Sequence, residues 1–141
     1  DLVLVFDSWA GILSPVSYQT FALPYLKKIC DAIEEVPITV FAKGAWFSME
    51  VVGQLDCQVV GVDWNTSPQK ARAWVGKDKV LQGNLDPCQL YASTDEVREA
   101  TKQMIKNFGG KHIANLGHGV YPDTPFDSIK CFVDTVKAYS Y

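Results

Sequence analysis

The sequence predicts an α/β fold made of one continuous run of β/α units. Short apolar segments that suit strands alternate with longer segments whose apolar residues have helical spacing. The strand-like segments are apolar at successive positions, which is typical of parallel strands covered on both faces. Polar and glycine-containing segments follow these strand-like segments directly. In β/α folds, such segments form the loops at the carboxyl ends of parallel strands.

Five apolar or β-branched runs are predicted to be strands, because such residues favour extended backbone. They cover residues 2–6, 38–42, 58–62, 80–82 and 112–115. A helical segment follows each run, so we expect the five strands to lie parallel in one sheet.

The helical segments cover residues 18–35, 45–55, 68–75, 94–108 and 126–139. Their ends carry capping signals, since Ser67 and Ser93 can each cap a helix start and Gly109 can end the fourth helix. Pro24 lacks an amide hydrogen and is expected to break the first helix near Leu23.

The polar segments after the strands are predicted to meet at one edge of the sheet. They cover residues 7–11, 43–44, 63–64, 83–87 and 117–119. In β/α barrels the loops after the strand ends form the active-site face. We therefore expect a functional site where these five segments converge.

Composition and charge disfavour several classes of protein. Hydrophobic residues make up 48% and charged residues 21%, which is enough apolar material for a core. The net charge of −3 and the lack of Lys or Arg runs disfavour nucleic acid and membrane partners. No apolar stretch approaches the ~20 residues that cross a bilayer, and no signal-peptide layout is present, so an intracellular location is expected. The four cysteines are far apart, which predicts reduced thiols without a zinc site or disulfide framework.

His118 is the sharpest local signal, because it stands between two glycines after the last predicted strand. Glycines leave the backbone uncovered for a ligand, and an imidazole supplies a donor or a titrating group near neutral pH. A functional histidine and a turn histidine that bonds only the backbone both remain open from spacing alone.

The segment of residues 6–11 puts a carboxylate, a hydroxyl and two rings beside one strand end, which suits a flat ligand carrying acid groups. Ser8 lacks the G-x-S-x-G elbow of a hydrolase nucleophile and is expected to donate a hydrogen bond. Lys43 can pair with an anionic substrate or form a Schiff base, although a rim lysine in an ion pair is commoner.

At two acidic positions, the sequence favours a structural role over a catalytic one. Asp63 and Trp64 can place a carboxylate and a stacking ring at the rim, or they can form a packed corner of the barrel. The packed corner is the favoured interpretation. Asp86 before Pro87 suits the cap of a short helix. Dinucleotide and P-loop motifs are missing from the sequence.

Five motifs taken together resemble the uroporphyrinogen decarboxylase family in order and spacing, over essentially the whole chain. They are FDSWAG (6–11), FAKG (41–44), VVGVDW (59–64), LQGNLDP (81–87) and NLGHG followed by YPDTP (115–125). The resemblance implies a TIM-type (β/α)8 barrel. Residues 1–141 would be the C-terminal part of this single domain, with about five parallel strands and their helices, and the N-terminal strands would be absent.

The resemblance also implies a cofactor-free lyase of porphyrin and heme biosynthesis. Such an enzyme removes the four acetate carboxyl groups of uroporphyrinogen III as carbon dioxide and gives coproporphyrinogen III. By motif match, Ser8 and His118 fall on substrate-binding positions and Phe6 lines the cleft. His118 is the candidate catalytic residue, which would bind or orient a substrate carboxylate, while Ser8 would donate a hydrogen bond to another; no metal or cofactor is implied.

Part of the family's machinery has no counterpart in this sequence. The arginines that clamp the carboxylates, the aspartate that faces the pyrrole nitrogens and a substrate-binding tyrosine belong to the N-terminal part of the family. We therefore expect this chain alone to be inactive. The resemblance further implies a tetrapyrrole substrate, a homodimer in full-length form, and a cytoplasmic location, or a plastid location in a plant.

Two alternatives remain. Zinc-dependent methyltransferases acting on corrinoid or thiol partners share this barrel type, but need a His-x-Cys pair and a later Cys as ligands. Here Lys43-Gly44-Ala45 and His118 occupy the corresponding positions. The second alternative is a non-catalytic scaffold or pseudoenzyme that only binds a partner, which nothing in the sequence excludes.

Overall fold

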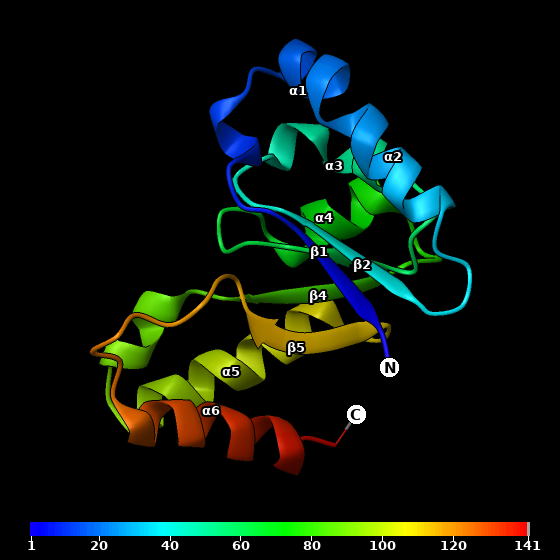
Figure 1. Cartoon of the computed structure of the whole chain (residues 1–141). Coiled ribbons are helices and arrows are strands. Elements are labelled where there is room, and N and C mark those ends of the chain that lie inside the picture. The colour runs from blue at the N-terminus through cyan, green and yellow to red at the C-terminus, as the bar shows by residue number, and fades with distance from the viewer. Residues whose placement is uncertain (141) are drawn as a thin grey trace.

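The computed structural model describes residues 1–140, in which five parallel strands form one sheet with helices around its outer face (Figure 1). The strands lie in sequential order, and every neighbouring pair is parallel. They are β1 (Val3–Asp7), β2 (Ile38–Ala42), β3 (Val59–Gly61), β4 (Val80–Leu85) and β5 (His112–Leu116). This is the arrangement of part of a β/α barrel, as the sequence predicted.

In the described part of the chain, six α-helices connect and follow the strands. They are α1 (Pro15–Phe21), α2 (Leu23–Asp31), α3 (Met49–Val52), α4 (Pro68–Val75), α5 (Thr94–Phe108) and α6 (Phe126–Ala138), with short 3-10 helices at Ala10–Ile12, Trp46–Ser48 and Pro87–Tyr91. Within residues 1–140, none of the helices has both the length and the apolar character needed to cross a bilayer.

Several helix ends confirm the predicted signals. Ser93 and Glu96 form a reciprocal capping box at the start of α5, and Gly109 follows its last residue. The Ser67 side chain accepts a hydrogen bond from the Lys70 amide at the start of α4. The first predicted helix is divided near Pro24, since α1 ends at Phe21 and α2 begins at Leu23.

Two predicted helices have the wrong bounds. The segment 18–35 is helical from Pro15, because the Ser14 hydroxyl caps α1 three residues earlier, and α2 ends at Asp31. The segment 45–55 holds only a 3-10 turn and the four-residue α3. Helix α3 stops at Gly53, where the backbone of Val75 passes so closely that an added Cβ would lie 3.0 Å from its Cα.

The fourth strand is longer than predicted. Residues 83–85, expected to form a loop, belong to β4 and pair with the whole end of β5. Asn84 tolerates this buried position because its side-chain amide donates to the backbone oxygens of Asp63 and Thr66, at 2.9 and 2.7 Å. Strands β1, β3 and β5 differ from the prediction by one residue at one or both ends, and β2 has the predicted bounds.

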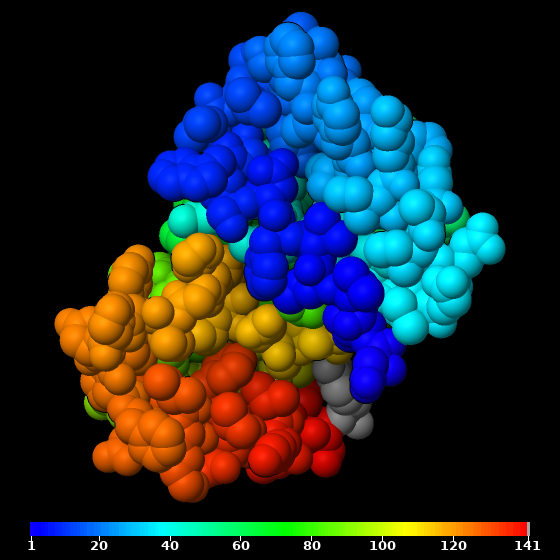
Figure 2. Space-filling model, viewed as in Figure 1, coloured from blue at the N-terminus to red at the C-terminus, as the bar shows by residue number. Residues whose placement is uncertain are grey.

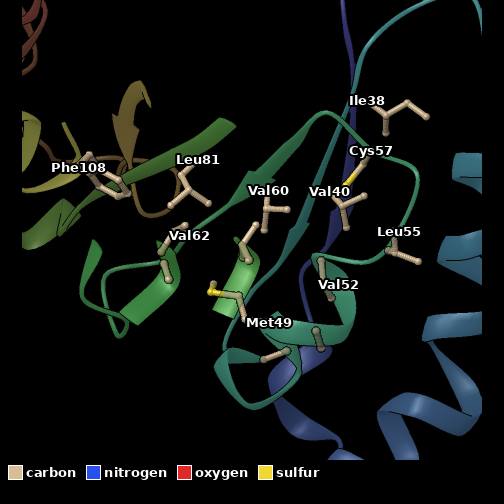
Figure 3. Packing of buried hydrophobic residues seen from close by; sticks show 14 of the residues in the cluster. Ile38, Val40, Met49, Val52, Leu55, Cys57, Val60, Val62, Leu81 and Phe108 are labelled. Atoms are coloured by element: carbon tan, nitrogen blue, oxygen red, sulfur yellow. The ribbon is translucent and has the colours of Figure 1, made fainter. Parts of the chain in front are cut away.

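The main core lies between the sheet and its helices (Figure 3). Val40 and Val60 of the sheet are almost fully buried, as are Val52 of α3 and Ala71 of α4. Fully burying a valine side chain contributes roughly 1.5–3 kcal/mol. This face of the sheet therefore holds the helices in place and leaves the opposite face for another role.

One register row runs across the opposite face of all five strands. Phe6 pairs with Phe41, which pairs with Gly61, then Gln82 and finally Ile113. Side chains alternate between the two faces along a strand. The side chains of this row therefore point away from the helix-covered core. Phe6 is 64% exposed and Ile113 is 37% exposed, so the row is buried at its centre and open at both edge strands.

Candidate functional site

A pocket of about 390 Å³ lies on the face of the sheet that carries this row. It is lined by residues from all five strands and from three of the loops after them: Leu4, Phe6, Ser8, Phe41, Gly61, Val62, Gln82, Asn115, Leu116, Gly117, His118 and Gly119. The three site residues predicted from the sequence, Phe6, Ser8 and His118, thus lie around one hollow.

The floor of the pocket is aromatic because of a gap left by glycine. The Phe6 and Phe41 rings meet edge to face, with centroids 6.1 Å apart. A Cβ at Gly61 would lie 2.7 Å from the Phe41 ring, so glycine is the residue that leaves space for this ring. Gln82, next in the row, brings an amide to the same floor. The result is an apolar surface with polar groups at its margin.

A second hollow of about 500 Å³ adjoins the first and shares Ser8 and His118 with it. Lys43 lines it, together with Trp9, Gly11, Ile12 and Gly44. Within residues 1–140, Lys43 forms no ion pair, so its ammonium group can meet an anionic ligand. Figure 2 shows the dark-blue N-terminal segment beside the gold-to-orange segment on this face of the molecule.

Two glycines bring the loops after β1 and β2 together. The Gly11 amide donates to the Lys43 oxygen at 2.9 Å, and the Lys43 amide donates to the Asp7 oxygen at 3.0 Å. A Cβ at Gly11 would lie 2.8 Å from the Gly44 Cα, and Gly44 has a φ of 74°. The backbone contact fixes Ser8 and Lys43 on neighbouring loops.

The loop that carries His118 is fixed at its start. The Gly117 amide donates to the Leu85 oxygen at 2.7 Å, and a Cβ on Gly117 would lie 2.6 Å from the Trp64 backbone nitrogen. The Trp64 and His118 rings meet edge to face, with centroids 6.3 Å apart. Further along this loop, the Tyr91 hydroxyl donates to the Asp123 carboxylate at 2.6 Å. That hydrogen bond is the main cause that raises the pKa of Tyr91.

The other acidic positions named from the sequence are structural. Asp63 is buried, and its carboxylate accepts from the amides of Gly44 at 2.6 Å and Asn65 at 3.0 Å. Asp86 caps the 3-10 helix after β4 by accepting from the Cys88 amide. Neither residue lines the two hollows, so the packed-corner and capping interpretations agree with the structure.

Asp7 does not line the pocket, although its neighbours Phe6 and Ser8 do. Alternation along β1 turns its carboxylate toward the helix side, where Tyr18 of α1 is fully buried. Burial raises the pKa of Asp7, and the nearby Trp9 amide and Tyr18 hydroxyl oppose this shift. The carboxylate expected beside a ligand is thus part of the structural layer.

Sequence reasoning missed several residues that line the pocket. Gln82 and Asn115 were assigned to predicted strands and to family motifs but not to the site, yet both line the hollow. The period-two alternation of a strand would have found them once Phe6 was taken as facing the ligand, because Gln82 lies in the same register row.

The cysteines form no cluster. All four are free; Cys30 and Cys57 are buried, and burial is the main cause that raises the pKa of Cys57 to about 11. Within the described residues, no group of three His, Cys, Asp or Glu side chains is arranged to hold a metal ion.

Comparison with known proteins identifies the family. The family model described as uroporphyrinogen decarboxylase matches residues 1–139. The chain belongs to the uroporphyrinogen decarboxylase family. The resemblance found in the sequence motifs is thereby confirmed.

Individual relatives agree with this assignment. The chain is 43% identical over 141 residues to the uroporphyrinogen decarboxylase of Christiangramia forsetii, and 44% identical over 146 residues to that of Homo sapiens. These alignments cover 99% and 96% of this chain but 41% and 40% of the relatives. The chain thus spans about 40% of the length of the uroporphyrinogen decarboxylases that it matches.

A solved structure shows the same fold at much lower identity. A methyltransferase from Methanosarcina mazei matches with a TM-score of 0.82 and 19% identity, over 97% of this chain and 42% of that chain. At this identity the likeness concerns the fold alone. It confirms the partial α/β barrel read from the strand order.

Proposed function

We propose that this chain is the C-terminal part of the barrel domain of a uroporphyrinogen decarboxylase, and that its pocket holds part of the tetrapyrrole. The single observation that carries the proposal is the joint position of Phe6, Ser8 and His118 around one hollow. The N-terminal strands of the relatives would then extend the sheet beyond β1 and β5, the two edge strands.

The pocket has the chemistry that a flat polycarboxylate needs. The aromatic floor of Phe6 and Phe41 offers apolar contact to a pyrrole ring, while hydroxyl, imidazole and ammonium groups stand at the margin. His118 binds or orients one substrate carboxylate, and Ser8 donates a hydrogen bond to another. Because Ser8 and His118 border both hollows, a macrocycle larger than either hollow can lie across them.

The reaction needs no cofactor, because the substrate supplies its own electron sink. A pyrrole ring protonated on carbon accepts the electron pair released when the bond to the acetate carboxylate breaks, and carbon dioxide leaves. A proton then adds to the exocyclic carbon and leaves a methyl group, while loss of the first proton restores the pyrrole. During these steps His118 and Ser8 bind carboxylates of the substrate. Their hydrogen bonds accelerate the reaction only if they become stronger as charge shifts in the transition state.

The remaining groups must come from the rest of the protein. The family resemblance assigns the carboxylate-clamping arginines, the aspartate facing the pyrrole nitrogens and a substrate-binding tyrosine to the N-terminal part. We therefore propose that this chain alone has no activity. A homodimer, and a cytoplasmic location or a plastid location in a plant, are proposed on the same ground.

The test uses the full-length protein. Uroporphyrinogen III is generated by chemical reduction, and carbon dioxide release and porphyrin products are measured by chromatography after oxidation. We expect coproporphyrinogen III as product. An intact full-length protein that releases no carbon dioxide would refute the proposal and favour the scaffold or pseudoenzyme alternative.

Substitution of His118 tests the site itself. A hydrogen bond to a charged group contributes about 1.5–3 kcal/mol, so His118→Ala should lower kcat/KM by roughly 10- to 150-fold. The melting temperature should stay near that of the wild type, because the side chain is exposed. Val120→Ala in the same loop is the matched control. Unchanged kinetics with a lowered melting temperature would show that His118 is structural.

The alternative of a zinc-dependent methyltransferase rests on the fold shared with the Methanosarcina mazei protein. Zinc in that chemistry needs thiolate ligands, and here Lys43-Gly44-Ala45 stands where the ligand pair is needed. Metal analysis of the purified full-length protein separates the two functions. Stoichiometric zinc would favour methyl transfer over decarboxylation.

A further inference from the structure

We propose that Trp64 is a positioning residue for His118, in that its indole ring holds the imidazole at the edge of the pocket. This inference rests on the proposed function, because it concerns how the site holds a substrate carboxylate. The sequence left open whether Asp63-Trp64 is a stacking ring at the rim or a packed corner. The structure divides the pair: Asp63 is the packed corner, and Trp64 supplies the ring.

The contact between the two rings is the basis of the inference. Their centroids are 6.3 Å apart and their planes meet at 77°, an edge-to-face geometry favoured by the charge distribution of aromatic rings. Among the described residues, the His118 side chain has no hydrogen bond or ion pair, and Trp64 is its one ring partner. The orientation of the imidazole toward the pocket therefore depends on the indole.

Trp64 can act in this way because its own backbone is fixed on both sides. The preceding Asp63 carboxylate accepts from the amides of Gly44 and Asn65, and the Asp63 oxygen accepts from the buried Asn84 amide at 2.9 Å. Gly117 packs against the Trp64 backbone nitrogen. The backbone that carries the indole is thus held by contacts with the loops after β2, β3 and β5.

His118 needs such support because glycines flank it. Glycine has the largest backbone freedom of all residues, and nothing within 4 Å surrounds the position of a Cβ on Gly119. Without the indole, the imidazole would sample several rotamers. Substrate binding would then have to restrict it to one rotamer, and this entropy loss would reduce the affinity for substrate. The cost of immobilising one side chain corresponds to an increase of about three- to tenfold in KM.

The experiment uses three variants of the full-length protein. Trp64→Leu removes the ring, Trp64→Phe keeps an aromatic face, and Trp74→Leu is the control, a half-buried tryptophan of α4 that stacks on Trp46. We expect Trp64→Leu to raise KM by about three- to tenfold with kcat changed less than twofold. Trp64→Phe should restore most of the affinity, and Trp74→Leu should leave KM unchanged.

A spectroscopic measurement tests the contact without activity. The imidazole signals of His118 in a proton–carbon NMR spectrum of the full-length protein are assigned by their loss in His118→Ala. The indole ring current should shift these signals, and Trp64→Leu should move them toward the values of an exposed histidine.

The outcomes separate this inference from the proposed function. If the wild type converts uroporphyrinogen but Trp64→Leu leaves both KM and the His118 signals unchanged, the positioning role is wrong. An equal rise of KM in Trp74→Leu would also refute it, because the effect would then be a general loss of packing. If the wild type releases no carbon dioxide, the proposed function fails, and the NMR comparison alone decides whether Trp64 positions His118.

Discussion

Acidification below pH 6.5 is expected to destabilise the fold through His112, the first residue of β5. Its ring stacks on Phe108 of α5, with centroids 4.0 Å apart and planes at 8°. Its Nε2 lies 2.6 Å from the Gly83 oxygen, while its buried Nδ1 has no partner. A neutral imidazole that donates from Nε2 fits this site, whereas protonation would add an N–H at Nδ1 without an acceptor.

The direction of the effect follows from the pKa of this group. Burial is the largest cause and lowers the pKa of His112 below its ordinary value of 6.5; the Gly83 carbonyl opposes the shift, and the charge of Arg72 adds to it. The unfolded chain therefore binds a proton more readily than the folded chain at pH below 6.5. The contribution of this group to the free energy of unfolding is therefore constant above pH 6.5, and it decreases progressively as the pH falls below that value.

The magnitude has an upper limit. The free energy of unfolding can change by at most about 1.4 kcal/mol per pH unit for one group. Between about pH 7 and pH 5.5, a histidine that stays neutral when folded lowers the free energy of unfolding by at most about 1.3 kcal/mol. The pKa values of Glu96 and Asp134 are lowered from 4.5 and 3.8, so the stability that they contribute is lost only at more acidic pH.

The assay is urea unfolding of the wild type and His112→Phe at both pH values. His112→Phe keeps a ring on Phe108 but loses the bond to the Gly83 oxygen, which should cost about 0.5–1.5 kcal/mol near neutral pH. Its free energy of unfolding should then depend much less on pH. His118→Ala is the control and should keep the pH dependence of the wild type. Equal pH dependence in the wild type and His112→Phe would refute the reasoning.

Two further substitutions test the backbone and a helix end. Gly83→Ala should lower the free energy of unfolding by at least about 3 kcal/mol, because Gly83 has a φ of 142° and an added Cβ would overlap the Val62 oxygen. Gly110→Ala, with nothing within 4 Å of the new Cβ, is the control in the same urea assay. Ser93→Ala should cost about 1 kcal/mol, because the hydroxyl accepts from the Glu96 amide in the capping box. Ser93→Asp should retain most of that stability, and equal losses in both Ser93 variants would contradict the capping role.

The fold was predictable where local chemistry and tertiary packing agree. Strand β2 has the predicted bounds because its apolar run is buried on both faces. Helix α5 also has the predicted bounds, since Ser93 and Gly109 mark its two ends. Helical spacing revealed neither that α3 ends before Gly53 nor that the Val75 backbone passes so close to Gly53 that an added Cβ would crowd it. That contact joins residues far apart in sequence.

The end of β4 shows a second limit of local signals. Glycine, asparagine and proline together favour a turn, and the sequence was interpreted accordingly. In the structure, Gly83 and Asn84 continue the strand, because the Asn84 amide finds two backbone acceptors in the loop after β3. A residue typical of turns thus becomes a buried link between two strand ends, and only the three-dimensional arrangement supplies its partners.

The candidate site was predictable to different degrees on its two sides. Within β1, the period of a strand turns Leu4 and Phe6 toward the pocket and Asp7 away, and Ser8 follows one residue beyond the strand end. His118 lies beyond the end of β5, where no strand period applies. Its place follows from the contact of Gly117 with Trp64 and from the curvature of the sheet, which brings residues of β1 and β5 to one hollow. The glycines that flank His118 marked it from the local sequence, whereas its contact with Trp64 and its place at the pocket depend on the three-dimensional arrangement.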